Sequence, residues 1–368
     1  MRPKLCYVLP EYRADDATHF SHIHDFLKEI VKYFDLFLII EKGGKPPVSL
    51  GCTRLYVAKI NFTPLRFFET LVVFIWARLS GYRDFYVHYS FSSAFAASLV
   101  SRLSRGRTFY WNCGEPWKYS RVFLREWFER IVYKMVTFQV TGAVSLADKY
   151  ASHYHILRAK IKIMPNWIDL RRFRTAKSKE EARRELNIPP GKKVVLFAHR
   201  LSPRKGSRMI IPVARELIKI LPETLFVVTG DGPDKERIAH EINDDTAVGK
   251  HVRLEGSIPN TEIPNYFAAA DVFFMPSEEE GFPRVLLETM ASGVPFVASD
   301  VGATRDIVPG FMSKYVIRTG DVKLFADKLC ELIEKNNDKQ KIISSELRKG
   351  VAKYDVVIVA KRFREMLI

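Results

Sequence analysis

Residues 271–300 read DVFFMPSEEEGFPRVLLETMASGVPFVASD, which predicts a strand, a loop, a helix, a turn and a second strand. Pro283 suits the first helical turn, where its missing N–H has no partner, and Gly293 suits the C-terminal stop. The helix between them is apolar on nearly every face, so it is predicted to be buried. Glu288 is its only acid. The segment therefore indicates a βαβ unit of a parallel sheet.

The rest of the chain repeats this alternation of short β-rich runs and longer helical patterns, which is typical of parallel sheets. Strands are expected at 5–9, 36–40, 55–58, 85–88, 108–111, 138–141, 161–164, 194–198, 225–229, 252–254, 272–275 and 295–298. Helices are expected at 19–33, 65–80, 92–103, 121–133, 146–155, 208–220 and 284–291.

We therefore predict an α/β fold of two doubly wound, Rossmann-like domains in tandem, spanning residues 1–168 and 169–352. The boundary follows Pro165-Asn166, because this pair after a strand breaks regular structure. Residues 353–368 include a short amphipathic helix. It packs either on the second domain or back on the first. Two such sheets are expected to bind ligands in a common cleft, at the carboxyl ends of their strands.

The composition excludes several classes of protein. A hydrophobic share of 47% with 27% charged residues excludes a disordered or fibrous chain. Four scattered cysteines without a CxxC pair argue against a disulfide scaffold or a zinc ribbon, and fit a reducing, cytoplasmic compartment. The longest apolar span, 67–77, contains Glu69 and falls short of the roughly 20 residues that a membrane crossing needs.

The positive charge is uneven along the chain. The net charge is +16, and residues 1–175 hold 27 Lys+Arg against 14 Asp+Glu. A one-sided positive field attracts anionic partners such as phosphorylated substrates, acidic lipids or nucleic acid. The alternative is a solvated basic surface with no such partner.

Glu280 and Glu288 are candidates for one polar pocket. Helical side chains point back toward the helix N-terminus, so Glu288 leans toward the loop that holds Glu280. Gly281 lets this loop bend and bring backbone N–H groups toward a ligand. Ionised carboxylates accept hydrogen bonds from vicinal diols, so Glu280 suits a sugar and Glu288 a ribose. The alternative is an exposed acidic loop for Glu280 and a cap or ion pair for Glu288.

Arg200 and Lys205 flank the turn that follows the first strand of the second domain. The turn precedes a helix, so two cations and the positive end of a helix dipole can converge on one anion such as a diphosphate. Solvated loop cations are the alternative. Arg204, between them, is expected to face solvent.

Two further turns, at 230–233 and 255–259, follow strands of the second domain and are candidates to hold a flat base by backbone contacts. Asp231 and Asp234 suggest a metal, but Gly232 and Pro233 between them favour an ordinary turn. No metal site is predicted.

These segments together resemble the retaining GT-B glycosyltransferases of group 1, family GT4. The resemblance rests on the Glu280–Glu288 spacing, the Arg200 to Gly206 turn, the 230–233 turn and the 165–169 linker, and it is dense over 161–310. It implies a GT-B fold, a nucleotide-diphosphate-sugar donor held by residues 169–352, an acceptor bound by residues 1–168, metal-independent transfer without a cofactor, and retention of anomeric configuration.

The resemblance also implies roles for single residues. Arg200 and Lys205 would neutralise the diphosphate as the glycosyl–phosphate bond breaks, and Glu280 would bind the donor sugar, so these three form the expected catalytic set. The expected donor-binding set is Glu288, Gly281, Phe282, Pro283, Gly230 and Ser257.

The first half departs from the family pattern. Residues 11–17 contain no glycine where many members have a Gly-Gly loop, and Asn112 or Glu115 is predicted to face the acceptor where members often place a histidine. The alternative for Glu115 is a turn residue before proline. The closely spaced histidines of the first helix are expected on its surface; they are His19, His22 and His24.

The helix around residues 67–76 is rich in Phe, Leu, Val and Trp, with Arg66 and Arg78 at its ends. It suits docking on an anionic membrane surface, in which case the acceptor is lipid-linked and the protein peripheral to the inner face of the membrane. The alternative is a buried core helix.

Three rival functions remain at this point. A sugar-nucleotide epimerase of the same fold would release free sugar or nucleotide without needing an acceptor. A phosphorylase of the pyridoxal type needs a Schiff-base lysine that the sequence does not identify. A basic nucleic-acid-binding protein would suit the net charge, but the sequence has no Arg-rich arm and no basic stripe with interleaved aromatics, so no nucleic acid partner is predicted.

Overall fold

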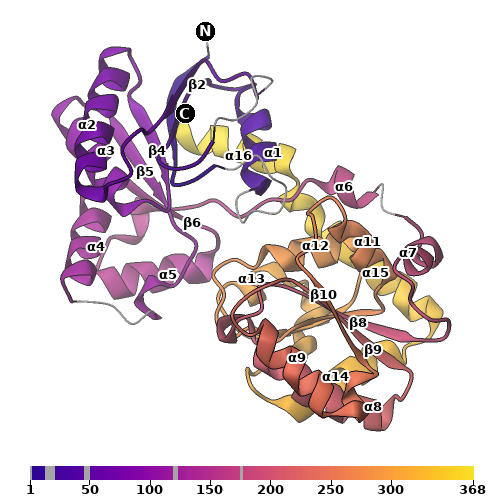
Figure 1. The fold of residues 1–368 in the computed structure, drawn as a ribbon. Coiled ribbons are helices and arrows are strands. Elements are labelled where there is room, and N and C mark those ends of the chain that lie inside the picture. Colours follow the sequence, from indigo (N-terminus) through magenta and orange to yellow (C-terminus); the bar gives the residue numbers. More distant parts are fainter. Residues whose placement is uncertain (1, 13–20, 45–49, 119–122, 175–176) are drawn as a thin grey trace. The chain divides into compact units, whose positions relative to one another are not determined.

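The computed structural model describes residues 2–12, 21–44, 50–118, 123–174 and 177–368. The chain divides into two compact units (Figure 1). Unit 1 comprises Met1–Trp167 and Val356–Ile368, and unit 2 comprises Ile168–Asp355. Each unit contains one parallel sheet with helices around it, as the alternation of strand and helix patterns predicted.

The sheet of unit 1 has the strand order β3-β2-β1-β4-β5-β6-β7. Within the described residues its strands are β1 (Lys4–Leu9), β2 (Asp35–Ile40), β3 (Arg54–Val57), β4 (Asp84–His88), β5 (Arg107–Trp111), β6 (Phe138–Thr141) and β7 (Ile161–Ile163). Every expected strand of this half lies within one residue of the observed one. All pairings are parallel, and β1 pairs with both β2 and β4, so the order of the strands turns back between β1 and β4.

The helices of unit 1 cover both faces of this sheet. They are α1 (Ser21–Ile30), α2 (Thr63–Leu79), α3 (Phe91–Leu103), α4 (Phe123–Met135), α5 (Val144–Tyr154) and α16 (Val356–Leu367), with 3-10 turns η2 (Pro116–Lys118) and η3 (Arg158–Lys160). Cys6 and Val8 of β1 join a buried core with α2, α3, α4 and α5. The alternate residue Tyr7 contacts Phe26 of α1 and Phe363 of α16, which places these two helices on the opposite face (Figure 1).

The prediction that His22 lies on a helix surface is wrong. Its side chain is buried, its ring packs against Trp167 at 5.5 Å, and its carbonyl accepts a hydrogen bond from Trp167 Nε1 at 3.1 Å. Tyr12 Oη and His24 Nδ1 lie 2.9 Å apart, whereas His19 lies outside the described residues. His22 is buried because the indole of Trp167 stacks on Phe26 of the same helix at 4.0 Å.

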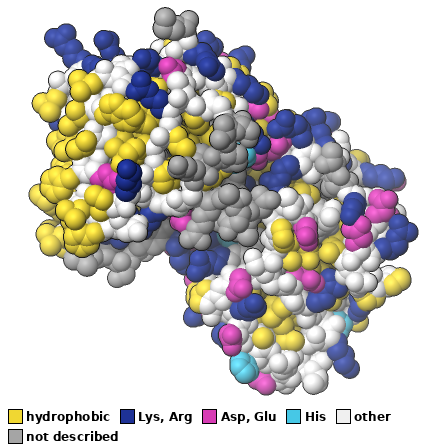
Figure 2. Space-filling view, turned by 45° about the horizontal axis from the view of Figure 1, so that its top comes forward, with side chains coloured by type: hydrophobic (Ala, Val, Ile, Leu, Met, Phe, Trp, Pro, Cys, Tyr) yellow, Lys and Arg dark blue, Asp and Glu magenta, His cyan; other side chains and the backbone are white. Residues whose placement is uncertain are grey.

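Helix α2 packs into the core along one side, as the core-helix alternative expected, while its docking on a membrane stays a prediction. Val73, Phe74 and Ala77 are buried in the core. Large hydrophobic side chains on the other side of the helix are exposed, and Figure 2 shows such side chains gathered over one face of unit 1. The helix therefore has an apolar inner face and an apolar outer face.

The sheet of unit 2 has the strand order β10-β9-β8-β11-β12-β13. Its described strands are β8 (Lys193–Ala198), β9 (Thr224–Thr229), β10 (Val252–Gly256), β11 (Val272–Met275), β12 (Phe296–Ser299) and β13 (Val316–Ile317). The sequence did not predict β13, because two residues are too few to produce an alternating pattern. It pairs with β12 through Ala298 and Val316.

The described helices of unit 2 are mostly short. They are α6 (Leu170–Arg174), α7 (Lys179–Glu185), α8 (Ile210–Ile220), α9 (Lys235–Asp244), α10 (Thr246–Gly249), α11 (Ile263–Ala269), α12 (Arg284–Ser292), α13 (Thr304–Ile307), α14 (Val322–Ile333) and α15 (Asn337–Val351). The 3-10 turns are η4 (Pro203–Lys205), η5 (Ser207–Met209), η6 (Gly310–Tyr315) and η7 (Ala352–Tyr354). Helix α12 is largely buried and ends at Gly293 in the left-handed conformation, with φ of 72°. Pro283 immediately precedes it as the N-cap residue.

Candidate functional site

The candidate site lies where the strand order of unit 2 turns back. Strand β8 pairs with β9 on one side and β11 on the other, so the segments that follow β8 and β11 leave the same carboxyl edge of the sheet. Open α/β sheets bind ligands in the crevice at such a point. The loop after β8 spans 199–206 and the loop after β11 spans 276–283.

Close packing fixes these two loops against each other. Gly206 has φ of 70°, and a Cβ atom there would lie 2.0 Å from the carbonyl oxygen of Pro276, so the loops approach this closely only with glycine. The backbone N–H of Glu278 donates to the carbonyl of Arg204 at 3.0 Å. These contacts fix the position of the β8 loop relative to the β11 loop.

Glu280 is the centre of a hydrogen-bonded cluster. Its side chain is 7% exposed, and its Oε1 accepts from Lys205 Nζ at 2.8 Å, Ser277 Oγ at 2.9 Å and His199 Nε2 at 3.1 Å. Burial by itself raises the pKa of this carboxyl, but the charge of Lys205 and the bond from His199 outweigh it and hold the pKa well below its usual value. The group is thus an ionised acceptor near neutral pH, and none of these bonds uses Oε2.

His199 is a residue of this cluster to which the sequence analysis gave no role. Its Nδ1 accepts the backbone N–H of Arg200 at 2.9 Å, so this nitrogen carries no proton. Nε2 therefore carries the proton and donates it to Glu280, which makes His199 a neutral donor. The only signal in the sequence was its position directly after a strand.

The three cations of the β8 loop differ in exposure and in their partners. Lys205 is largely buried against Glu280, whereas Arg200 is exposed. Arg204, expected to face solvent, is half exposed but pairs with Glu279 at 3.0 Å. Lys205, a predicted phosphate-binding cation, thus forms an ion pair with Glu280, the predicted sugar-binding acid.

Glu288 is not hydrogen-bonded to Glu280. It accepts from Arg284 Nη2 at 3.2 Å, one helical turn earlier on α12, and its side chain is 22% exposed. This is the ion pair expected as the alternative to a ribose-binding role. Part of the carboxylate is accessible, so its role toward a ribose stays a prediction.

The turns after β9 and β10 lie beside the β8 loop. Gly230 has φ of 128°, and a Cβ atom there would lie 1.9 Å from the carbonyl oxygen of His199. Its N–H donates to the carbonyl of Gly256 at 2.7 Å, and the exposed Ser257 follows. Gly230 and Ser257 therefore border the same edge of the sheet as Glu280.

The other expected donor-binding residues of this loop contact neighbouring residues of unit 2. Phe282 is buried, with its ring against Tyr354 at 5.8 Å in an edge-to-face arrangement. The carbonyl of Gly281 accepts from Ala303 N–H at 2.8 Å, and Pro283 caps α12. The side chain of Phe282 thus shapes the loop.

Asp231 and Asp234 each have partners that suit a turn. Asp231 accepts from Gly232 N–H at 2.7 Å, and Asp234 accepts from Ser207 Oγ. Among the residues that the structure describes, no group of three or more His, Cys, Asp and Glu side chains could hold a metal ion. The prediction of metal-independent chemistry is not tested by this finding.

Asn112 and Glu115, the predicted acceptor residues, lie in unit 1. Asn112 Nδ2 donates to Tyr133 Oη at 3.2 Å, and its Oδ1 accepts from Gly114 N–H. Glu115 is buried and pairs with Lys118 at 2.6 Å and Lys149 at 2.8 Å. Both residues have structural partners, and their role toward an acceptor stays a prediction.

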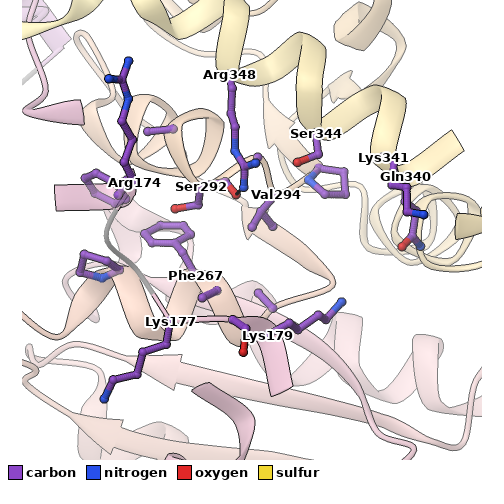
Figure 3. Close-up of a pocket in the computed structure, with 18 of the residues that line it drawn as sticks. Arg174, Lys177, Lys179, Phe267, Ser292, Val294, Gln340, Lys341, Ser344 and Arg348 are labelled. Atoms are coloured by element: carbon purple, nitrogen blue, oxygen red, sulfur yellow. Dashed lines mark hydrogen bonds between the residues drawn. The ribbon is translucent and has the colours of Figure 1, made fainter. Parts of the chain in front are cut away.

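A cavity of about 740 Å³ in unit 2 is separate from these loops (Figure 3). Asp271 and Pro295, which line it, precede β11 and β12, so it lies at the amino edge of the sheet. Figure 3 shows Arg348 reaching toward Ser292, whose carbonyl accepts its Nη2–H at 2.9 Å. None of the predicted site residues lines this cavity.

Part of the chain is similar in sequence to known glycosyltransferases. Residues 178–349 match the family model described as Glycosyl transferases group 1. The D-inositol 3-phosphate glycosyltransferase of Corynebacterium urealyticum is 30% identical over 228 residues, 60% of this chain and 52% of that protein. The UDP-Gal:alpha-D-GlcNAc-diphosphoundecaprenol alpha-1,3-galactosyltransferase of Escherichia coli is 28% identical over 178 residues, 48% of this chain and 46% of that protein. The chain spans about half the length of these curated relatives.

Solved structures share the fold. Anabaena Alr3699/HepE in complex with UDP and glucose aligns with a TM-score of 0.80 at 17% identity, covering 100% of this chain and 99% of that chain. Sucrose-phosphate synthase from Thermosynechococcus elongatus aligns with a TM-score of 0.77 at 18% identity, covering 99% of this chain and 98% of that chain. The predicted fold class of two Rossmann-like domains is confirmed.

Proposed function

We propose that this chain, whose residues 178–349 belong to the group 1 glycosyl transferases and whose fold is GT-B, transfers a sugar from a nucleotide-diphosphate-sugar donor to a hydroxyl acceptor. The observation that carries the proposal is the Glu280 cluster at the carboxyl edge between β8 and β11. There an ionised carboxylate, a lysine and a neutral histidine converge. The likeness to a structure that holds UDP and glucose supports the same class of donor.

In this proposal Arg200 and Lys205 bind the diphosphate. Lys205 spends one of its three N–H donors on Glu280, so two are left for phosphate oxygens. The exposed guanidinium of Arg200 offers a planar set of donors that suits phosphate. These fixed cations stabilise the negative charge that develops as the leaving group departs, which is why we propose metal-independent transfer.

The sugar is oriented by Glu280 and the ribose by Glu288. Oε2 of Glu280 remains available to accept sugar hydroxyls while Oε1 is held by the cluster. In the reaction the anomeric C–O bond to the diphosphate breaks and a C–O bond to the acceptor oxygen forms on the same face. The acceptor proton passes to the departing diphosphate, and the anomeric configuration is retained.

We further propose that the acceptor is a sugar or lipid-linked hydroxyl, and that the protein acts at the cytoplasmic surface of a membrane. The Escherichia coli relative is named for a GlcNAc-diphosphoundecaprenol acceptor, which supports a lipid-linked class. None of the described helices has the length and apolar character to span a membrane. The association that we propose is peripheral.

A thermal-shift screen of UDP-, GDP- and ADP-sugars tests the donor assignment. At least one sugar nucleotide should raise the melting temperature, because a ligand that binds only the folded state stabilises it. Arg200→Ala or Glu288→Ala should remove most of this shift. Arg204→Ala is the matched control, since it removes a cation of the same loop that already pairs with Glu279. The donor assignment is wrong if no sugar nucleotide changes the melting temperature.

Product analysis with the stabilising donor separates transfer from its rivals. Transfer requires an acceptor and gives a glycoside of retained configuration, which proton NMR detects through the anomeric coupling. Release of free sugar or nucleotide without an acceptor would instead indicate an epimerase. Activity that persists in excess chelator would support the metal-independent mechanism.

A further inference from the structure

One face of unit 1 carries exposed hydrophobic side chains that the proposed sugar transfer does not use. On the outer side of α2, Phe68, Val72 and Leu79 are 61%, 66% and 83% exposed. With Leu65 and Ile75 they recur at intervals of three and four residues, so they form one stripe along the helix. Scattered exposed hydrophobics are ordinary on a protein surface, but a continuous stripe marks an interaction surface.

The stripe extends beyond α2 onto its neighbouring helices. Ring contacts connect Phe67 of α2 with Phe95 of α3 at 6.1 Å, and Phe95 with Phe128 of α4 at 5.3 Å, so the three helices form one layer. Figure 2 shows hydrophobic side chains gathered on this part of unit 1. The apolar face is defined here as Leu65, Phe68, Val72, Ile75, Leu79, Leu103, Phe123, Leu124 and Trp127.

Positive charge borders the apolar face at one end. Arg78 of α2 donates to the carbonyl of Ser104 at 2.7 Å, and Arg102 of α3 donates to the carbonyl of Lys134 at 3.4 Å. The C-terminal ends of the three helices therefore meet. Exposed there are Arg102, Arg105 and Lys134.

The acids near this layer are already paired. Asp84 accepts from Arg107 Nη2 at 2.7 Å and from Arg107 Nε at 2.8 Å. Glu69 of α2 accepts from Tyr56 Oη and Lys59 N–H, both at 2.7 Å. These bonds leave the charge of Glu69 in place, so the positive excess beside the apolar face is that of Arg102, Arg105 and Lys134 at the other end of α2.

We propose that the apolar face and the cations beside it dock unit 1 on the surface of an anionic phospholipid bilayer. Apolar and aromatic side chains enter the boundary between headgroups and acyl chains, while Arg and Lys at the rim bind lipid phosphates. A second copy of this chain is the less suitable occupant, because its matching face is bordered by the same cations and not by phosphates that could bind them. The inference rests on the peripheral membrane association proposed above, names the surface responsible for it, and does not depend on the donor site in unit 2.

Vesicle co-sedimentation of the full chain tests this assignment. Phosphatidylcholine vesicles and vesicles rich in phosphatidylglycerol are compared, with Phe68→Asp/Val72→Asp as the test variant. Both replaced side chains are more than half exposed, so the fold is retained, as a melting curve verifies. Ile342→Asp is the matched control, since Ile342 is 64% exposed on α15 of unit 2.

The wild type and the control should bind the anionic vesicles, more weakly as salt is raised, and the test variant should bind at least about ten-fold less. Donor-induced stabilisation should be the same in all three proteins, so failure of the sugar-transfer proposal would be seen separately. Equal binding of variant and wild type, or no binding of the wild type to anionic vesicles, would overturn the proposal. A dimer that the double variant abolishes, without vesicle binding, would assign the face to a second copy.

Discussion

Lys205→Met tests whether the Glu280 cluster is held by charge. The change keeps the unbranched chain up to the ε position but removes the ammonium group that donates to a carboxylate with 7% exposure. Breaking a buried ion pair by removing one partner costs about 3–5 kcal/mol. His199 and Ser277 still donate to Glu280, so we expect the lower end, about 3 kcal/mol. For a unit of this size, that lowers the melting temperature by about 6–12 °C.

The loss should depend on pH in a defined direction. The folded-state pKa of Glu280 lies below its ordinary value of 4.5. Its contribution to wild-type stability is therefore fully present above that value and is lost as the pH falls through the folded-state pKa. In the variant, burial acts without the opposing charge of Lys205, so Glu280 binds a proton at a higher pH than in the wild type. The deficit of the variant should be largest near neutral pH and should shrink on acidification.

Urea unfolding monitored by circular dichroism, at about pH 7.5 and about pH 4.5, measures both effects. Lys219→Met is the matched control, because Lys219 pairs with Glu216 on the surface of α8, where such a pair contributes at most about 1 kcal/mol. The reasoning is refuted if Lys205→Met costs no more than the control. A deficit that stays constant or grows with acidification would equally contradict it.

Three other substitutions probe single contacts. Gly206→Ala would place a Cβ atom 2.0 Å from the carbonyl oxygen of Pro276, so it should destabilise unit 2 by more than about 2 kcal/mol and weaken donor binding, as thermal shift with and without sugar nucleotide would detect. Phe363→Ala removes a fully buried ring of α16 and should cost about 3–5 kcal/mol, measured by urea unfolding of the full chain. His199→Ala removes a donor to Glu280 and should lower the rate of sugar transfer about ten-fold. His199→Gln keeps a side-chain N–H donor and should restore part of that rate. Steady-state kinetics of both variants would measure the two effects.

The fold could be predicted from the sequence because its signals are local. Apolar runs mark the strands, and Gly293 ends α12 in the left-handed conformation that glycine adopts most readily. The two-residue strand β13 was missed, since it exists only through pairing with β12. His22 was misplaced for a related reason, because its burial depends on Trp167, which is remote in sequence. Contacts between distant segments leave no periodicity in either one.

Two members of the Glu280 cluster were candidates from the sequence, but their pairing, and the part of His199 in the cluster, could not be predicted. Lys205 and Glu280 were both identified, yet the sequence suggested that one binds phosphate and the other a sugar. Their ion pair results from the approach of two loops that Gly206 permits. Glu288 was expected to share a pocket with Glu280, but in the structure it pairs with Arg284 at i−4, a contact available within one helix.

The state of Glu280 limits what it can do in the proposed reaction. A carboxyl whose pKa lies well below its usual value carries no proton near neutral pH, so it cannot act as a general acid. The same low pKa makes it a weak base, and its Oε1 is already occupied by three donors. Glu280 is therefore suited to orient hydroxyls and to oppose developing positive charge on the sugar. The acceptor's proton must then leave through another group, and the departing diphosphate is the one that the proposed reaction itself supplies.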